Sequence, residues 1–478
     1  MGNKLFPALL VLTLFLPAPA NASPAAPAPE TLTFGRFGKV TLYRPATQPR
    51  HVVLFLSGDG GWNQGVVDMA RILVGMDAAV AGISTPHLLR QIARSNEKCS
   101  YPASDLETLG KIVERRYGFE RYVPPVLVGY SSGATLVYAA LAQAPPATFR
   151  GGISLGFCPD LPLVRPFCSG HGLTGVPGPR GKGIVFQPAR LETPWIAFQG
   201  DADQVCSKEL SVRYTEQTPG SELVLLPKVG HGFSVESRWV PQFRESFRRL
   251  TREDAGGVKP AGGAGEDGPV RDLPLVEVPA RQPGGDTLAV VLSGDGGWAG
   301  LDKEIAGELA GRGIAVVGLN SLQYFWKART PDESGHDLER ILRHYLPAWH
   351  RDKVLLVGYS LGADVLPFLA RRLPPDLLER TRLIALLGPD HTAEFEFHLS
   401  EWLGGGEEAG RPVLPELQGL AGRPILCVYG KAESDSLCPE VNPPLGKSIG
   451  LEGAHHFGGD YQAVADLLLR EAQLGGSR

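Results

Sequence analysis

The sequence has no surplus of positive charge and, beyond its first residues, no long apolar run. Lysine and arginine number 47 against 51 aspartates and glutamates, so the formal net charge of the 478 residues is −4. This balance offers no basic field for nucleic acid, and we expect no nucleic-acid partner. The CxxC and HxxxH spacings of metal sites are also missing, so we expect neither a metal nor a cofactor.

The first 22 residues have the pattern of a secretory signal peptide. Lys4 precedes an apolar core over residues 5–16, and Ala20-Asn21-Ala22 provides a small-residue cleavage site before Ser23. No cysteine stands directly at the cleavage site, which argues against a lipoprotein, and a retained N-terminal anchor is the alternative. Because no later run of eighteen apolar residues occurs, we predict a soluble periplasmic protein. Its residues 23–30 would form a flexible leader.

The cysteines are even in number, which in an exported chain favours disulfides over metal ligation. Cys427 and Cys438 are the two cysteines of the second half, so we predict that they pair. The other four allow three pairings, and the sequence leaves these open. They are Cys99, Cys158, Cys168 and Cys206.

The chain contains two copies of one domain. The heptapeptide LSGDGGW occurs at residues 56–62 and again at 292–298, and further landmarks follow both copies in the same order. In each copy short apolar strands alternate with helical patterns, which predicts an α/β fold with a mostly parallel sheet flanked by helices. We therefore predict a tandem pair of α/β-hydrolase-like domains at residues 31–250 and 271–478, joined by a linker over residues 251–270.

Both copies carry the G-x-S-x-G motif of a nucleophile elbow. Ser131 lies in GYSSG and Ser360 in GYSLG, each between an apolar strand pattern and a helical pattern. This strand–turn–helix context is the one that the motif requires. We predict both serines as nucleophiles.

An acid and a histidine follow each serine in the order expected of this fold. The first copy offers Asp203 and His231. In the second copy we predict Asp435 and His455, because Asp435, like Asp203, lies three residues before a cysteine. Glu433 is the alternative acid and His456 the alternative base.

The repeated heptapeptide follows a strand and can supply backbone N–H groups to an oxyanion. Its tryptophans, Trp62 and Trp298, are expected to pack under the loop. The second donor would come from the residue after each serine. The predicted donors are Asp59 or Gly60 with Ser132, and Asp295 or Gly296 with Leu361.

Several longer motifs together resemble the AcvB/VirJ family of bacterial periplasmic virulence proteins. They are LSGDGGW, GYSLGADVLPF, YFWKARTP and FEFHLSEWLG. The resemblance implies α/β-hydrolase domains in a two-copy chain that hydrolyses lysyl-phosphatidylglycerol at the outer face of the inner membrane. It implies Ser360, Asp435 and His455 as the catalytic residues, and a link to type IV secretion components. The first copy keeps Ser131, Asp203 and His231, so the resemblance does not imply that this copy is inactive.

A lysyl substrate brings two amines, which carboxylates near Ser360 would bind. Asp390 and Glu394 have helix-like spacing after an apolar strand, and we predict that they bind the amines. The aromatic and basic segment YFWKART (324–330) suits either a lipid headgroup interface or the core. We expect the second copy to carry most activity. Another esterase or thioesterase, or a non-catalytic secretion factor, is the alternative function.

Overall fold

The computed structural model describes residues 27–95, 98–252, 268–282, 285–298, 300–396 and 410–474. The predicted signal peptide, the first half of the leader and residues 253–267 of the predicted linker lie outside the described residues. So do residues 397–409, which include most of the FEFHLSEWLG motif.

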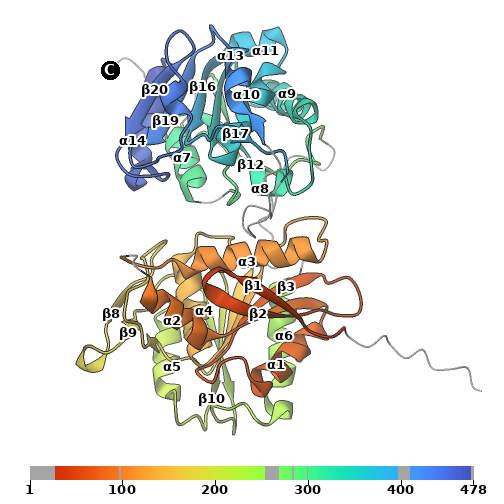
Figure 1. The fold of residues 1–478 in the computed structure, drawn as a ribbon, viewed down its shortest axis with the longest axis vertical. Helices are drawn as coiled ribbons and strands as arrows, with labels where there is room; N and C mark the ends of the chain where they lie inside the picture. Colours follow the sequence, from red (N-terminus) through yellow and green to blue (C-terminus); the bar gives the residue numbers. More distant parts are fainter. Residues whose placement is uncertain are drawn as a thin grey trace, which may run out of the picture.

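Each copy forms a separate mostly parallel sheet, which confirms the predicted fold class (Figure 1). The first sheet has the order β1-β2-β4-β3-β5-β6-β10-β11. Its strands are β1 Glu30–Phe34, β2 Gly38–Tyr43, β3 His51–Leu56, β4 Ala78–Ile83, β5 Val126–Tyr130, β6 Gly151–Leu155, β10 Trp195–Gly200 and β11 Ser221–Leu226.

The second sheet repeats this order without a counterpart of β1, as β12-β14-β13-β15-β16-β19-β20. The strand β2 of the first sheet and its counterpart β12 of the second each pair antiparallel with the next strand of the sheet, β4 or β14. The central strands of both sheets are parallel. The strands are β12 Leu275–Val278, β13 Thr287–Leu292, β14 Ala315–Leu319, β15 Lys353–Tyr359, β16 Thr381–Leu387, β19 Ile425–Gly430 and β20 Lys447–Leu451.

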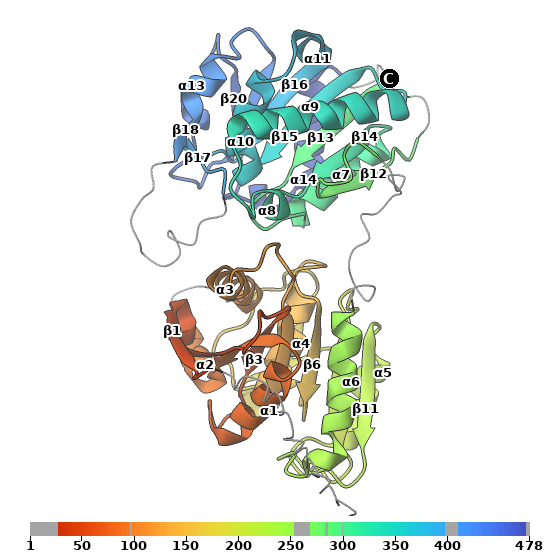
Figure 2. The same cartoon turned by 90° about the vertical axis from the view of Figure 1, so that its right-hand side faces the viewer.

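Helices cover both faces of each sheet (Figures 1 and 2). In the first domain they are α1 Gln64–Val74, α2 Thr85–Arg94, α3 Pro102–Arg116, α4 Ser132–Gln143, α5 Lys208–Glu216 and α6 Val240–Thr251. In the second they are α7 Gly300–Gly311, α8 Ser321–Tyr324, α9 Pro331–Ala348, α10 Leu361–Arg371, α11 Pro375–Arg380, α13 Val413–Gln418 and α14 Tyr461–Glu471.

The short elements lie in the loops between these strands and helices. They are β7 Asp160–Leu161, β8 Gly175–Pro177, β9 Ile184–Phe186, β17 Thr392–Ala393 and β18 Arg411–Pro412, with the 3₁₀ turns Gly35–Phe37, Pro179–Gly181, Glu236–Arg238, Cys438–Glu440 and Phe457–Gly459.

The central strands are apolar throughout because both of their faces are covered. In β13 every residue of TLAVVL is buried, which is the pattern of a strand in the middle of a parallel sheet. The helices begin at clear sequence signals. The longest, α9, starts with a capping box in which Thr330 and Glu333 bond each other's backbone N–H groups, and Pro331 occupies its first position.

Three disulfides use all the cysteines. The predicted bond Cys427–Cys438 is present. The pairings that the sequence left open are Cys99–Cys168 and Cys158–Cys206. Such a complement of disulfides indicates an oxidising compartment outside the cytoplasm. None of the described helices has the length and apolar character needed to cross a membrane.

The two domains pack head to tail. In the second domain, the loops at the carboxyl ends of the strands face the first domain. The first domain meets them with α3 and with the segment before β5, at the end of its sheet opposite Ser131. Trp326 is 1 % exposed there, its indole N–H donates to the carbonyl oxygen of Phe119 at 2.9 Å, and its ring lies 5.5 Å from that of Tyr122. Both views place α3 and α8 at this boundary (Figures 1 and 2).

Candidate active sites

Ser131 and Ser360 occupy equivalent strained turns at the ends of β5 and β15. Their φ and ψ angles are 55° and −122°, and 51° and −124°. Positive φ is unfavourable for a residue with a Cβ, and such strain concentrates at functional sites. The flanking glycines are needed because a Cβ on Gly129 would lie 2.2 Å from the carbonyl oxygen of Gly133. The structure therefore has the elbow that the motif predicts, twice.

The first copy brings its three predicted catalytic side chains together. His231 Nε2 lies 3.0 Å from Ser131 Oγ, and its Nδ1 lies 2.9 Å from Asp203 Oδ2. The other carboxylate oxygen of Asp203 accepts from the backbone N–H groups of Val205 and Cys206 at 2.8 and 3.0 Å. Burial alone would raise the pKa of Asp203, but the hydrogen bonds from Cys206, His231 and Val205 lower it. A charged carboxylate is therefore held against the imidazole, as base activation requires.

The disulfide Cys158–Cys206 braces this acid loop, because Cys206 also donates to Asp203. We expect the double change Cys158→Ala/Cys206→Ala to lower the stability of the first domain by about 2–5 kcal/mol, as is typical of lost native disulfides. It should also lower Ser131-dependent ester hydrolysis at a temperature where the domain remains folded.

The matched control removes the other disulfide of this domain, Cys99–Cys168. Thermal unfolding and the turnover of a Ser360→Ala chain measure the two effects. If both cysteine pairs changed turnover equally, the bond between residues 158 and 206 would have only a general stabilising role.

In the second copy the predicted histidine has a carboxylate partner, but this partner is not the predicted acid. His455 Nδ1 lies 2.8 Å from Glu433 Oε1, whereas Asp435 is exposed and has no such contact. Glu433 is largely buried, with 12 % of its side chain exposed. The prediction of Asp435 is wrong, and the alternative, Glu433, has the acid's position.

The error arose because the cysteine used to align the copies is not equivalent. Cys206 bonds Cys158, in the loop after β6, whereas Cys438 bonds Cys427, within β19. The equivalent landmark is the glycine that ends each strand. A Cβ on Gly200 or Gly430 would lie 2.0 or 2.2 Å from a carbonyl oxygen of the loop that carries the histidine. The acid follows this glycine by three residues in both copies.

His455 lies where His231 does. A Cβ on Gly156 would come within 3.1 Å of the His231 ring, and one on Gly388 within 2.8 Å of the His455 ring. The second site is more open, because 41 % of the His455 side chain is exposed against 16 % for His231. Among the described residues, no hydrogen bond joins His455 to Ser360.

The alternative base, His456, is engaged elsewhere. Its Nδ1 lies 3.1 Å from the hydroxyl of Tyr359. Burial, together with the nearby His455, lowers the pKa of His456. This residue packs beside the site, and its ring is not bonded to an acid.

The glycine loop lies beside each serine. A Cβ on Gly58 would lie 3.1 Å from the Cβ of Ser131, and one on Gly294 would lie 3.3 Å from that of Ser360. A Cβ on Gly82 would lie 2.1 Å from the ring of Trp62, so this tryptophan packs under the loop as predicted. A Cβ on Gly318 would lie 2.2 Å from the ring of Trp298, so the second tryptophan packs in the same way. The assignment of oxyanion donors stays a prediction: Asp59 or Gly60 with Ser132, and Asp295 or Gly296 with Leu361.

The predicted amine-binding residues lie near Ser360, but not on a helix. The two-residue strand β17 lies between Asp390 and Glu394, so the expected helical face is wrong. The backbone N–H of Asp390 donates to Asp364 Oδ1 at 2.7 Å. Burial raises the pKa of Asp364 well above its usual range, and the neighbouring carboxylates Asp390, Asp295 and Glu394 raise it further, against the lowering by this hydrogen bond.

Asp364 is the residue that sequence reasoning missed. It lies four residues after Ser360, on the first turn of α10. The first copy has Thr135 at this position, so GYSLGAD differs from GYSSGAT by a carboxylate. That difference between two otherwise similar motifs was the available signal.

The aromatic side chains of residues 324–326 do not face a lipid. Tyr324, Phe325 and Trp326 are at most 1 % exposed. The first two pack in the core of the second domain, and Trp326 packs against the first domain. Only the polar end of the segment is accessible, with Lys327 exposed and Arg329 half-buried. The interpretation as core packing is confirmed, and the headgroup interpretation is wrong for these rings.

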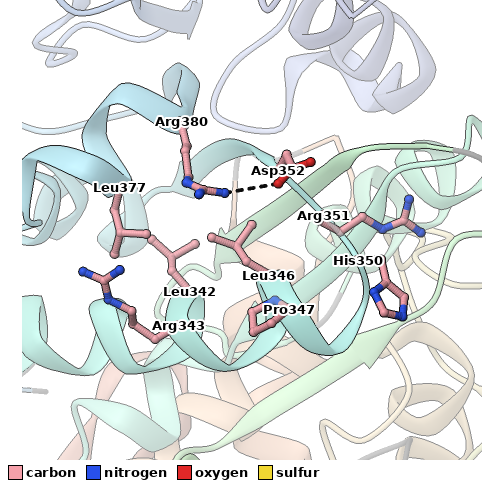
Figure 3. A pocket seen from close by; sticks show the side chains of 9 residues that line it. All are labelled: Leu342, Arg343, Leu346, Pro347, His350, Arg351, Asp352, Leu377 and Arg380. Carbon is pink, nitrogen blue, oxygen red and sulfur yellow. Dashed lines mark hydrogen bonds and ion pairs between the residues drawn. The ribbon is translucent and has the colours of Figure 1, made fainter.

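A cavity of about 600 Å³ lies at the other end of the second domain (Figure 3). Its lining includes His350, Arg351 and Asp352, which directly precede β15, whereas Ser360 follows it. Figure 3 shows the ion pair between Arg380 and Asp352, whose nitrogen and oxygen atoms lie 3.2 Å apart. The length of the strand separates this cavity from the candidate nucleophile, so it is not part of the site.

The sequence matches a family model described as bacterial virulence protein (VirJ) over residues 50–151 and 286–474, more than half of the chain. No curated protein matches it. Among solved structures, an esterase domain from Rhodothermus marinus is similar at 17 % identity, covering 46 % of this chain and 98 % of its own, with a TM-score of 0.32. A dienelactone hydrolase from Anabaena variabilis is similar at 18 % identity, covering 48 % and 98 %, with a TM-score of 0.34.

Proposed function

Because the chain belongs to the VirJ family of bacterial virulence proteins, we propose that it is a periplasmic serine esterase that hydrolyses the aminoacyl ester of lysyl-phosphatidylglycerol. The observation that carries the serine-esterase part of the proposal is the hydrogen-bonded chain Ser131–His231–Asp203 at 3.0 and 2.9 Å in a strained elbow. The three disulfides fit the compartment. The lipid would be presented at the outer face of the inner membrane.

The reaction has two steps. Serine Oγ attacks the ester carbonyl carbon while the histidine takes its proton, and backbone N–H groups stabilise the oxyanion. The tetrahedral adduct expels the glycerol oxygen of phosphatidylglycerol, which receives the proton from the histidine, and a lysyl-serine ester remains. Water, deprotonated by the same histidine, then attacks this ester. Free lysine leaves and the serine recovers its proton.

The carboxylates of the second copy support its assignment to the lysyl ester. Asp364 carries a buried carboxyl group on the first turn of the helix that follows Ser360, and burial together with the charges of Asp390, Asp295 and Glu394 raises its pKa. Such a group of like charges is disfavoured when empty, and a substrate ammonium relieves the repulsion. The first copy has a threonine where Asp364 lies, and its site suits an uncharged acyl group better.

We expect the double change Asp390→Asn/Glu394→Gln to weaken cleavage of the lysyl ester selectively. Replacing two charge-assisted hydrogen bonds by neutral ones, a loss of about 1 kcal/mol each, should lower kcat/KM for lysyl-phosphatidylglycerol about 10- to 100-fold. The hydrolysis of p-nitrophenyl acetate should change little, because Ser360, His455 and the glycine loop are untouched. Lysine release from vesicles that contain the lipid, measured beside p-nitrophenol release, gives the ratio.

The matched control neutralises two acids on α11, at the other end of the domain, as Asp376→Asn/Glu379→Gln. It should leave both substrates unaffected. An unchanged ratio in the first variant would reject these residues as the amine site and direct attention to Asp295 and Glu433. If the unaltered protein released no lysine, the proposed substrate itself would be wrong.

A further inference from the structure

The first domain contacts three of the loops at the strand ends of the second domain. The loop after β13 receives Lys111, and the loop after β14 provides Leu322 and Trp326, which cluster with Tyr122. After β16, Glu396 lies 3.7 Å from the guanidinium group of Arg115. These are the loops in which open parallel sheets build their sites. The contact is therefore placed on the functional face of the second domain.

One of these contacts reaches the predicted oxyanion loop. Lys111 Nζ donates to the backbone carbonyl oxygen of Asp295 at 3.2 Å. Asp295 directly follows Gly294, on which a Cβ would lie 3.3 Å from the Cβ of Ser360. On its other side Lys111 lies 3.2 Å from Glu107 Oε1, one turn earlier on α3, and only 7 % of the lysine side chain is exposed.

In the first copy's own loop, no described side chain donates a hydrogen bond to the corresponding carbonyl oxygen. Its counterpart of Asp295 is Asp59, which is exposed. The head-to-tail packing explains the difference, since α3 contacts this loop of the second domain but lies at the end of the first domain's own sheet opposite Ser131. The two loops share one sequence, so the added contact is a property of the tandem arrangement.

We infer that Lys111 is a positioning residue for the active site of the second domain: from the first domain, it fixes the loop that carries the oxyanion donor beside Ser360. This inference rests on the proposed esterase function. A buried ammonium group bonded to a carbonyl oxygen orients the peptide unit that follows, whose N–H belongs to Gly296, one of the two donors predicted in this loop. Oxyanion donors act in the transition state, so misplacing them lowers kcat more than it raises KM.

The test uses the full chain with one nucleophile removed at a time. In a Ser131→Ala chain, where only Ser360 can react, Glu107→Gln/Lys111→Met removes the lysine without leaving its buried partner charged. We expect kcat for p-nitrophenyl acetate to fall about 10- to 100-fold, with KM nearly unchanged. Glu107→Gln alone keeps the bond to Asp295 and should keep kcat. Lys111→Arg should recover part of the loss.

Two further measurements separate positioning from a general loss of structure. In a Ser360→Ala chain the same double change should leave Ser131-dependent turnover intact. Lys303→Met, which removes another contact between the domains, the bond to the carbonyl oxygen of Pro146, should leave the turnover of both sites intact. Equal losses at both serines, or an unchanged kcat at Ser360, would overturn the inference.

Hydrogen exchange gives a readout that does not depend on the reaction. In the unaltered chain, amides of residues 294–297 should exchange more slowly than in the Glu107→Gln/Lys111→Met chain, while those of residues 58–61 stay the same. Equal exchange at residues 294–297 would reject positioning by Lys111. If exchange responds as expected but the Ser131→Ala chain hydrolyses no ester, the positioning stands and the proposed activity of the second site fails.

Discussion

Replacing Ser360 with alanine is expected to lower the hydrolysis of lysyl-phosphatidylglycerol about a thousandfold or more. Removal of a triad nucleophile leaves only the catalysis that comes from binding and the oxyanion donors. The loss should be large even though Ser131 remains, because the carboxylates that suit a lysyl group lie near Ser360. Lysine release from lipid vesicles by the full chain measures it.

The matched variant, Ser131→Ala, should retain most lysine release. It should lose a share of the hydrolysis of p-nitrophenyl acetate, since the complete triad of the first copy needs no charged substrate. Equal losses of lysine release in the two variants would mean that the sites share the substrate. A loss confined to Ser131→Ala would reverse the assignment of the copies.

Replacing Glu433 with glutamine is expected to lower Ser360-dependent turnover on the order of ten-thousandfold, the effect of neutralising a triad acid. The amide cannot stabilise the imidazolium ion, and its NH₂ group can turn the histidine to the unproductive tautomer. Steady-state kinetics in a Ser131→Ala chain isolate this site.

Asp435→Asn provides the control, because this residue is two positions away and exposed. Its kcat should stay within about twofold, the range of a surface change with no contact to the histidine. A large loss in Asp435→Asn with none in Glu433→Gln would restore the acid that the cysteine spacing suggested.

The sequence was sufficient for everything that depends on local chain geometry. The tight turn around Ser131 needs glycines on both sides, and that need is visible as G-x-S-x-G. The order of serine, acid and histidine follows from the strand order, and the placement of His231 agrees with it. The doubled heptapeptide similarly revealed two equivalent loops, with Trp62 and Trp298 beneath them.

What could not be predicted depends on contacts between distant residues. Counting from Cys438 gave the wrong acid because a cysteine's position means little until its partner is known. The rings of residues 324–326 looked suited to lipid because the sequence does not show what buries them. Tyr324 and Phe325 lie in the core of the second domain, and Trp326 packs against the first domain. Asp364 remained unnoticed since a carboxylate on a helix is usually solvated, and only the fold brings Asp390 beside it.

The head-to-tail packing gives the two domains unequal structural roles. A face-to-face pair would have matched equal surfaces, so each copy would serve the other in the same way. Here the back of the first domain supports the second, while the back of the second, with the cavity of Figure 3, supports neither of the two sites. If Lys111 positions the second site, a substitution that inactivates Ser131 would still leave the first domain necessary for the active site of the second. The reverse is not expected, because the hydrogen-bonded chain of Ser131, His231 and Asp203 lies wholly within the first domain.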